Sequence, residues 1–420
     1  MNQKLVCSEN KQAFIWVTFL FFLWGIPNNL NGILIKQFMK SFELSIFEAS
    51  LVQSVFYIGY FIFAIPAALI LRRFGYKQGL LTGLILFAVG CLLFWPAAHL
   101  CSYAFFLFSL FIIASGLTFL ETGANPFIVE LGDKQTAERR LNFSQSFNPI
   151  GSILGVIIGT LFVFSGIDPD PQMIEEMKLQ GSYDSFLKKE TLQVVLPYIM
   201  LAVVAFLWVI VAIRIRFPRT TQCNNMQKSY SWGYSVKQLF RNKSFLKGVF
   251  SLFMYVGAQV GTWSYFIFYA QRYTGASEKE AGYMLTGTIV AFALGRILST
   301  ELMKHISPVK LMYAYGIVNI LLVLVSLFFA NAIGLWCLLA TSFFMSIMYP
   351  TLFSLSVKGL GEQQEVGSSI LVMSILGGAV LTPLMGYIMD KTEVSYAMCI
   401  PLIAYICITK YSYSIFCTKN

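Results

Sequence analysis

Apolar runs of about 20 residues, separated by shorter polar segments, recur along the whole chain. A helix that crosses the hydrocarbon core of a bilayer needs about 20 mainly apolar residues, and the runs that reach this length predict membrane-spanning helices. They number twelve and lie near residues 13–36, 47–71, 78–97, 101–131, 141–166, 192–217, 246–271, 279–303, 308–330, 332–357, 365–389 and 394–416. The pattern therefore predicts an all-α polytopic membrane protein.

The composition supports this prediction. Of the 420 residues, 57% are hydrophobic and only 12% are charged, and the mean hydropathy is +0.69. An ordinary soluble domain is about 25% charged, so a soluble multidomain protein, a disordered chain and a disulfide-rich secreted module are excluded. The eight cysteines show no CxxC spacing and there are only two histidines. We therefore expect no metal site and no cofactor, and the net charge of +10 does not indicate nucleic-acid binding in a chain this apolar.

The positions of Lys and Arg predict the orientation of the chain. Excess basic residues of membrane proteins lie in cytoplasmic loops. If the N-terminus is cytoplasmic, 22 of the 30 Lys and Arg residues fall on the cytoplasmic side. This favours an even number of spans with both termini in the cytoplasm. The acid-rich segment 167–191 then lies outside, and the segment 218–245, which contains no acid, lies inside.

Matching motifs in the two halves of the chain indicate a duplication. The pairs, which lie about 224 residues apart, are Gly59-Tyr60 with Gly282-Tyr283, Arg73 with Arg296, Pro126 with Pro350 and Gly151 with Gly377. We predict two pseudo-symmetric six-helix bundles over residues 1–217 and 246–420, joined by a cytoplasmic loop over 218–245. Duplicated halves with substrate held at mid-membrane depth are typical of transporters.

One carboxyl group stands out inside the spans. Glu121 lies near the middle of the apolar run 103–131. A charge at the bilayer centre costs roughly 2.5–3.5 kcal/mol on insertion scales, so this carboxyl is either protonated or paired. We interpret Glu121 as a proton-coupling residue. The structural alternative is a permanently neutral acid that holds two helices together.

Amide and indole side chains gather in the same spans at helical spacing. Asn125 follows Glu121 by four residues, and Gln145 precedes Asn148 by three, so each pair shares one helix face. Amides bond to sugar hydroxyls and an aromatic face stacks on a sugar ring, whereas the alternative is hydrogen bonding between helices, worth roughly 0.6 kcal/mol per bond. We predict a polar sugar-binding cavity whose candidate residues are Trp24, Asn29, Asn31, Asn125, Gln145, Asn148, Gln259 and Trp263.

Other polar residues are assigned by position. Arg73 and Arg296 fall at predicted inner helix ends, where they form gating salt bridges, cap the last turn of a helix or simply set the topology. Asp168 and Asp170 are interpreted as solvated loop carboxylates rather than a metal-binding pair. The sequence contains no P-loop and no HExxH, GxSxG or GxGxxG motif, so ATP-driven transport and standard hydrolase chemistry lack the residues they need.

Several of these segments together resemble the major facilitator superfamily and, within it, the L-fucose:proton symporter family. They are FFLWGIPNNLNG (21–32), QSVFYIGYF (53–61), GLTFLETGANPF (116–127), LNFSQSFNPIG (141–151), YVGAQVGTWSY (255–265) and SIMYPTLFSLSVKGLG (346–361). The resemblance implies two six-helix bundles, a central sugar cavity and alternating access driven by a proton gradient. It also implies that Glu121 is the family's membrane-embedded glutamate, and that Asn29, Gln145 and Asn148 line the cavity with Trp24 near them.

One position departs from the family pattern. The fucose symporters resemble this chain up to the NNLN stretch and then carry an aspartate where this chain has Gly32. One of two buried carboxyls is therefore missing, which implies a different coupling or a different sugar.

We therefore expect a bacterial inner-membrane transporter, a monomer, that carries L-fucose or a related hexose with a proton. Glucose, galactose and N-acetylhexosamine carriers remain open alternatives, as does a facilitator without proton coupling. A membrane-embedded sugar transferase is the alternative of another class, and it would depend on Asp168 and Asp170.

Overall fold

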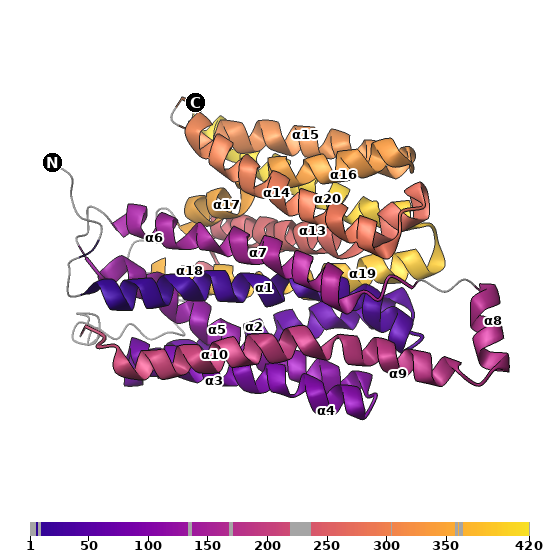
Figure 1. Cartoon of the computed structure of the whole chain (residues 1–420). Helices are drawn as coiled ribbons and strands as arrows, with labels where there is room; N and C mark the ends of the chain where they lie inside the picture. The colour runs from indigo at the N-terminus through magenta and orange to yellow at the C-terminus, as the bar shows by residue number, and fades with distance from the viewer. Residues whose placement is uncertain are drawn as a thin grey trace. The chain divides into compact units, whose positions relative to one another are not determined.

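The computed structural model describes residues 6, 10–132, 137–167, 171–218, 237–303, 305–357, 360 and 364–419, and each regular element in these ranges is a helix (Figure 1). The chain divides into two compact units. Unit 1 comprises Met1–Asn31, Ile58–Ser165 and Pro171–Ser229, and unit 2 comprises Gly32–Tyr57, Gly166–Asp170 and Tyr230–Asn420. The predicted division into continuous bundles at 218–245 stays a prediction, and residues 219–236 lie outside the described part.

Two helices contribute residues to both units. They are α1 (Lys11–Ser41) and α2 (Ile46–Phe74). The remaining helices of unit 1 are α3 (Tyr76–Leu92), α4 (Phe94–His99), α5 (Tyr103–Glu130), α6 (Ala137–Gln145), α7 (Phe147–Ile158), the π-helix η3 (Gly159–Val163), α8 (Pro171–Leu179), α9 (Tyr183–Gln193) and α10 (Val195–Arg214).

The remaining elements of unit 2 begin with α13 (Lys243–Thr274), a helix of 32 residues. It packs against several of the others. The rest are α14 (Glu278–Leu302), α15 (Pro308–Phe328), α16 (Ala332–Met345), α17 (Met348–Val357), α18 (Gln364–Met373), α19 (Leu376–Lys391), the 3-10 helix η5 (Val394–Met398) and α20 (Cys399–Lys419).

The predicted spans agree closely with the helices. Eleven stretches in the described residues are long and apolar enough to cross a membrane. The predicted seventh span is the helix α13, which is long enough but is not among those eleven. Because more than half of its residues are buried, α13 does not need the apolar outer surface of a helix surrounded by lipid.

Some predicted spans are interrupted, which the hydropathy pattern did not show. The fifth span breaks at Ser146, between α6 and α7, and the eleventh breaks at Ser374, between α18 and α19. In each case the serine hydroxyl donates to a carbonyl three residues back, Phe143 O and Leu371 O respectively. Such side-chain bonds compete with the helix and bend it.

The long acid-rich segment 167–191 also differs from the expectation of a loop. It contains α8 and α9, and α9 leads into α10 almost end to end (Figure 1). Asp168 and Asp170, which were interpreted as solvated loop carboxylates, lie outside the described residues.

Glycines bring helices within each unit into backbone contact. A Cβ atom at Gly151 would overlap the carbonyl oxygen of Phe22 on α1, and one at Gly377 would overlap that of Phe253 on α13. These two glycines were matched by sequence spacing, and they make the same kind of contact in the two units. The contact supports the predicted duplication.

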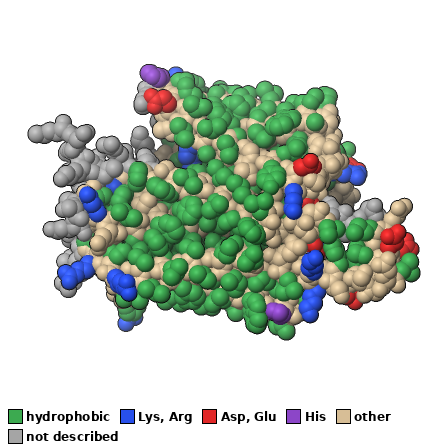
Figure 2. Space-filling view, in the orientation of Figure 1, with side chains coloured by type: hydrophobic (Ala, Val, Ile, Leu, Met, Phe, Trp, Pro, Cys, Tyr) green, Lys and Arg blue, Asp and Glu red, His purple; other side chains and the backbone are tan. Residues whose placement is uncertain are grey.

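Apolar side chains also cover the outside of the molecule. On the face shown in Figure 2, hydrophobic side chains occupy most of the surface and charged ones lie mainly toward its edges. Large apolar residues such as Leu69, Val203 and Leu321 are more than half exposed. An apolar surface of this extent is unfavourable in water and is normal in lipid.

Candidate functional site

Helix α5 carries the two residues predicted at the centre of the site. Asn125 lies one turn after Glu121, and its Nδ2 donates to the Glu121 carbonyl oxygen at 3.0 Å. Pro126 is the next residue of the helix. It lacks a backbone N–H and therefore removes one hydrogen bond of the helix. Both Glu121 and Asn125 are half-buried in the midst of an apolar helix.

Gln145, at the last residue of α6, extends this polar group. Its Nε2 donates to Asn125 Oδ1 at 3.2 Å, and its side chain is exposed. Glu121, Asn125 and Gln145 therefore form a connected group, here called the polar row. The structure brings these three predicted residues together within unit 1 and leaves them accessible.

Two further predicted amides bond to the backbone of α1. Asn148 Nδ2 donates to Phe21 O at 3.2 Å, and Asn29 Nδ2 donates to Gly25 O at 3.0 Å. Gly25 permits the close approach, because a Cβ there would lie 2.5 Å from Asn148 O. Both amides are half-buried.

Trp24 and Asn31 lie deeper than the sequence suggested. The Trp24 ring is 5% exposed and lies 4.4 Å from the Phe21 ring. Asn31 is completely buried, and neither of its amide atoms has a hydrogen-bond partner among the described residues. The structure does not place these two in the accessible polar row, and their role in sugar binding stays a prediction.

Tyr60 is a site residue that the sequence reasoning missed. It is buried on α2, and its side chain lies near the Glu121 carboxyl. The Gly59-Tyr60 pair was used only as a marker of the repeat. A tyrosine one residue from a helix-packing glycine was a signal that could have identified it.

In unit 2 the predicted site residues lie on α13, close to aromatic rings. Gln259 and Trp263 are one turn apart on α13 and both are half-buried. The indole Nε1 of Trp263 donates to Ser342 Oγ at 3.1 Å, and its ring packs edge-on against Phe292 with centroids 5.2 Å apart. Phe292 and Ser342 were not predicted, although Phe292 lies one turn before Arg296.

The two arginines predicted as gating residues have different surroundings. Arg296 lies 4.8 Å over the Phe292 ring and donates from Nε and Nη2 to Ser346 O at 3.4 and 3.3 Å. Ser346 is the C-cap of α16, so a cation complements the negative end of a helix there. Arg73 is exposed and its guanidinium lies 5.3 Å from the neighbouring Phe74 ring. A gating role for either residue stays a prediction.

Two basic residues counted for topology also cap helices. Arg140 is completely buried and donates to Ile128 O at 2.8 Å and to Val129 O at 2.6 Å, at the end of α5. Lys77 donates to Ile215 O at 2.9 Å, just after α10. Both satisfy carbonyl groups that a helix end leaves without a partner.

The family is decided by comparison with known proteins. The model of the Major Facilitator Superfamily matches residues 17–383 of the chain. This chain belongs to the major facilitator superfamily. The all-helical fold of the described residues and their eleven stretches apolar enough to cross a membrane agree with that membership, and the chain is a multi-pass membrane protein.

Within this superfamily the chain is similar to sugar transporters. It is 40% identical over 373 residues to an L-fucose-proton symporter of Escherichia coli, covering 88% of this chain and 85% of that protein. It is 32% identical to a glucose/galactose transporter of Brucella abortus, covering 95% and 93%. A solved structure of a fucose:proton symporter in the outward conformation is 38% identical with a TM-score of 0.71, covering 96% and 98%.

Proposed function

We propose that this protein is a sugar:proton symporter that works by alternating access, with Glu121 as its proton site. The observation that carries the proposal is the half-buried Glu121 side chain within the otherwise apolar α5. The backbone carbonyl of Glu121 accepts from Asn125, which in turn accepts from Gln145. A carboxyl that is accessible at that depth can exchange its proton when water reaches it. The named relatives include symporters and sugar transporters, which supports transport rather than a membrane-embedded transferase.

The proposed substrate is a hexose or a 6-deoxyhexose. The relatives are described as carrying L-fucose or glucose and galactose. Amide groups in unit 1 offer donors and acceptors for hydroxyl groups, and the half-buried Trp263 in unit 2 offers a ring face. L-fucose and glucose or galactose both fit this chemistry, and Gly32 in place of the aspartate of the fucose symporters leaves the choice to experiment.

The cellular setting follows from the same reasoning. We propose that the protein is a monomer in a bacterial inner membrane. We place both termini in the cytoplasm, because 22 of its 30 basic residues then fall on the cytoplasmic side. It needs no cofactor, since the proton gradient supplies the driving force.

The decisive experiment is sugar uptake into proteoliposomes by the Glu121→Gln variant, with and without an inward proton gradient. We expect the variant to lose uphill accumulation but to keep counterflow exchange of labelled sugar. Glutamine can still form hydrogen bonds, but it cannot take up and release a proton. Glu130→Gln is the matched control. Glu130 lies on the same helix, at its last residue, where it accepts from the Tyr76 hydroxyl at 3.2 Å.

A panel of labelled L-fucose, glucose, galactose and N-acetylglucosamine in the counterflow assay identifies the sugar. Undiminished uphill uptake by Glu121→Gln would refute the role of this residue. A facilitator is recognised separately, because adding sugar to de-energised cells would then cause no external alkalinisation.

A further inference from the structure

One lysine of unit 2 lacks a charged partner. Lys36 lies in the part of α1 that belongs to unit 2, within the candidate span Lys11–Ser41. It is half-buried, and its ammonium nitrogen lies 5.2 Å from the centre of the Phe268 ring on α13. Among the residues that the structure describes, it forms neither an ion pair nor a side-chain hydrogen bond. An ionisable group in a membrane span is costly and is normally paired or functional, so Lys36 is a candidate for binding an external anion.

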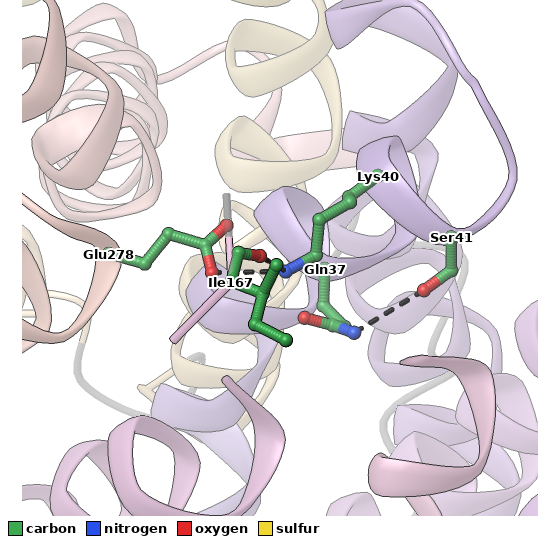
Figure 3. Close-up of polar contacts among 5 residues, drawn as sticks. All are labelled: Gln37, Lys40, Ser41, Ile167 and Glu278. Carbon is green, nitrogen blue, oxygen red and sulfur yellow. Dashed lines mark hydrogen bonds and ion pairs between the residues drawn. The ribbon is translucent and has the colours of Figure 1, made fainter. Parts of the chain in front are cut away.

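The next lysine of α1 has a full set of partners. Lys40 Nζ lies 3.0 Å from Glu278 Oε2, and it donates to the Ile167 carbonyl oxygen at 3.1 Å (Figure 3). The side chains of this ion pair are only 8% and 0% exposed. Both lysines belong to unit 2. The same unit therefore neutralises Lys40 and leaves Lys36 against an aromatic ring.

Other acids of unit 2 also have partners within it. The two carboxylate oxygens of Asp390 accept from backbone amides at the start of α2, at 2.8 Å each. Glu48 accepts from Ser45 N at 2.9 Å, and Glu393 lies 3.3 Å from Arg272. These carboxylates would have to give up existing contacts to neutralise Lys36, whereas an anionic ligand has no such internal contacts to lose.

The contact between α1 and α13 brings Lys36 near two predicted sugar-binding residues. Gly32 lies one turn before Lys36, and a Cβ there would lie 3.7 Å from the carbonyl oxygen of Trp263. One turn of helix advances about 5.4 Å, so Lys36 follows by one turn the point where α1 meets Trp263. Trp263 and Gln259 are half-buried, and the Gln259 amide has no hydrogen bond within the described part of the chain. The cation and these two side chains therefore belong to neighbouring parts of unit 2.

Position 32 leaves the cation uncompensated. Residues four apart on a helix interact, so an acidic side chain at position 32 would pair with Lys36, but glycine offers none. A neutral acceptor lies nearby on α2. Gln53 is 3% exposed and its Nε2 donates to Ser264 Oγ at 2.9 Å, while its Oε1 has no partner among the described residues. This part of unit 2 thus offers a cation for a carboxylate and an unused acceptor for a hydroxyl group.

We propose that Lys36 binds the carboxylate of a hexuronate, a hexose whose C6 is oxidised to a carboxylate, and that the protein transports such sugar acids. The inference rests on the proposed function, for which it names a substrate class. A hexuronate has the ring and hydroxyl groups of the hexoses considered above and differs from them at C6. A hydrogen bond between ammonium and carboxylate is stronger than the contact of an ammonium with a ring, so the ligand draws Lys36 away from Phe268.

The test measures binding to the purified full chain in lipid nanodiscs by isothermal titration calorimetry. The probes are galacturonate and its methyl ester, which keeps the ring and the C6 carbonyl group but has no charge. Glucuronate and its methyl ester form a second pair. We expect the parent protein to bind at least one of the acids about tenfold or more tightly than its ester, because a hydrogen bond to a charged group contributes this much to affinity.

Three variants test the assignment to Lys36. Lys36→Gln should abolish the preference for the acid over the ester, and Lys36→Arg, which keeps the charge, should retain most of it. Gly32→Asp should also abolish the preference, because the new carboxylate lies one turn before Lys36 and competes with the ligand. The Cβ of this variant makes only ordinary contacts, the nearest with Ser264 Cα at 3.5 Å.

Lys279→Gln is the matched control. Lys279 is another half-buried lysine of unit 2 with no ion pair among the described residues. It lies at the start of α14, where a Cβ at Gly166 would come within 3.2 Å of its Nζ. Its replacement lowers the net charge as much as Lys36→Gln does, and it should leave the preference for the acid unchanged.

The proposal is overturned if the parent protein binds neither acid, if it binds each acid no more tightly than its ester, or if Lys279→Gln loses the preference as Lys36→Gln does. Should Lys36→Gln fail to elute as a monodisperse protein, Gly32→Asp decides, and an unchanged preference in that variant refutes the role of Lys36. Binding requires no proton gradient. Uptake of neutral sugars by the parent and by Glu121→Gln therefore tests the proposed function separately.

Discussion

In unit 1 Gly151 packs on the carbonyl oxygen of Phe22, and in unit 2 Gly377 packs in the same way on that of Phe253. The side chains placed on this common scaffold differ. Five residues before Pro126 unit 1 has the half-buried Glu121, whereas five residues before Pro350 unit 2 has Met345, which is completely buried.

The other polar side chains of the two units also differ. Unit 1 presents a carboxyl with amides, and unit 2 presents Trp263 beside Phe292 and Arg296. The glycine packing is therefore shared by the two units, while the side chains that we propose to meet a proton or a sugar differ. Under the proposed function, unit 1 would serve proton exchange and hydroxyl bonding, and unit 2 ring stacking.

The largest effect is expected from moving the acid from one unit to the other. In Glu121→Met with Met345→Glu, the new carboxyl would lie where the Tyr405 hydroxyl now contacts Met345 Sδ at 3.4 Å, in a fully buried position. We expect a cost of roughly 2.5–3.5 kcal/mol in stability and no uphill uptake. Thermal unfolding and proteoliposome uptake measure the two. Accumulation driven by a proton gradient in this double variant would show that proton coupling does not require the surroundings of position 121.

The next effect tests the shared scaffold. Gly151→Ala and Gly377→Ala should each destabilise the protein by roughly 1–3 kcal/mol, because the added Cβ overlaps a backbone oxygen. The two losses should be similar, as measured by the thermal unfolding of the purified protein. Gly287→Ala is the control, since its Cβ would meet only Leu339 Cδ1 at 3.5 Å. If only one of the two variants lost stability, the two units would not share this helix packing.

A moderate effect separates the two tryptophans. Trp263→Leu should raise the half-saturating sugar concentration by up to about tenfold, since ring stacking contributes about 0.5–1.5 kcal/mol. Trp24→Leu, at a ring that is only 5% exposed, should instead lower stability with a smaller change in affinity. Counterflow kinetics and thermal unfolding distinguish the two outcomes, and the reverse pattern would move the stacking role to unit 1.

The smallest effect concerns two buried asparagines. Asn31 in unit 1 and Asn319 in unit 2 are completely buried, and their amide atoms have no hydrogen-bond partner among the described residues. Replacement by leucine should stabilise each by about 1 kcal/mol, because an unsatisfied polar group is removed. We expect Asn31→Leu also to weaken sugar uptake, whereas Asn319→Leu leaves uptake unchanged. Equal uptake in both variants would remove Asn31 from the candidate site.

Much of the fold was predictable because the hydropathy of a segment indicates directly whether it spans the lipid bilayer. The predicted run 308–330 corresponds to α15, and the run 279–303 to α14, within two residues. The breaks at Ser146 and Ser374 were not predictable in this way, since a serine in an apolar run does not reveal whether its hydroxyl bonds back to the helix.

The site was predictable only where residues lie close in sequence. Helical spacing correctly placed Asn125 one turn from Glu121, and the structure adds the bond to Gln145. Residue spacing does not show which side chains are accessible. Trp24 and Asn31, which are buried, were therefore predicted as cavity residues in the same way as the exposed Gln145. The Lys40–Glu278 pair joins positions far apart along the chain, and no local pattern predicts such a contact.

The composition of α13 has a consequence for how the protein is made. This helix begins the C-terminal half of the chain, yet it is not among the stretches apolar enough to cross a membrane unaided. The hydroxyl groups of Tyr255 and Tyr265 and the indole N–H of Trp263 donate to groups on α16 and α19, which are synthesised later. We therefore expect α13 to become stably inserted only after those downstream segments have emerged and enclosed it.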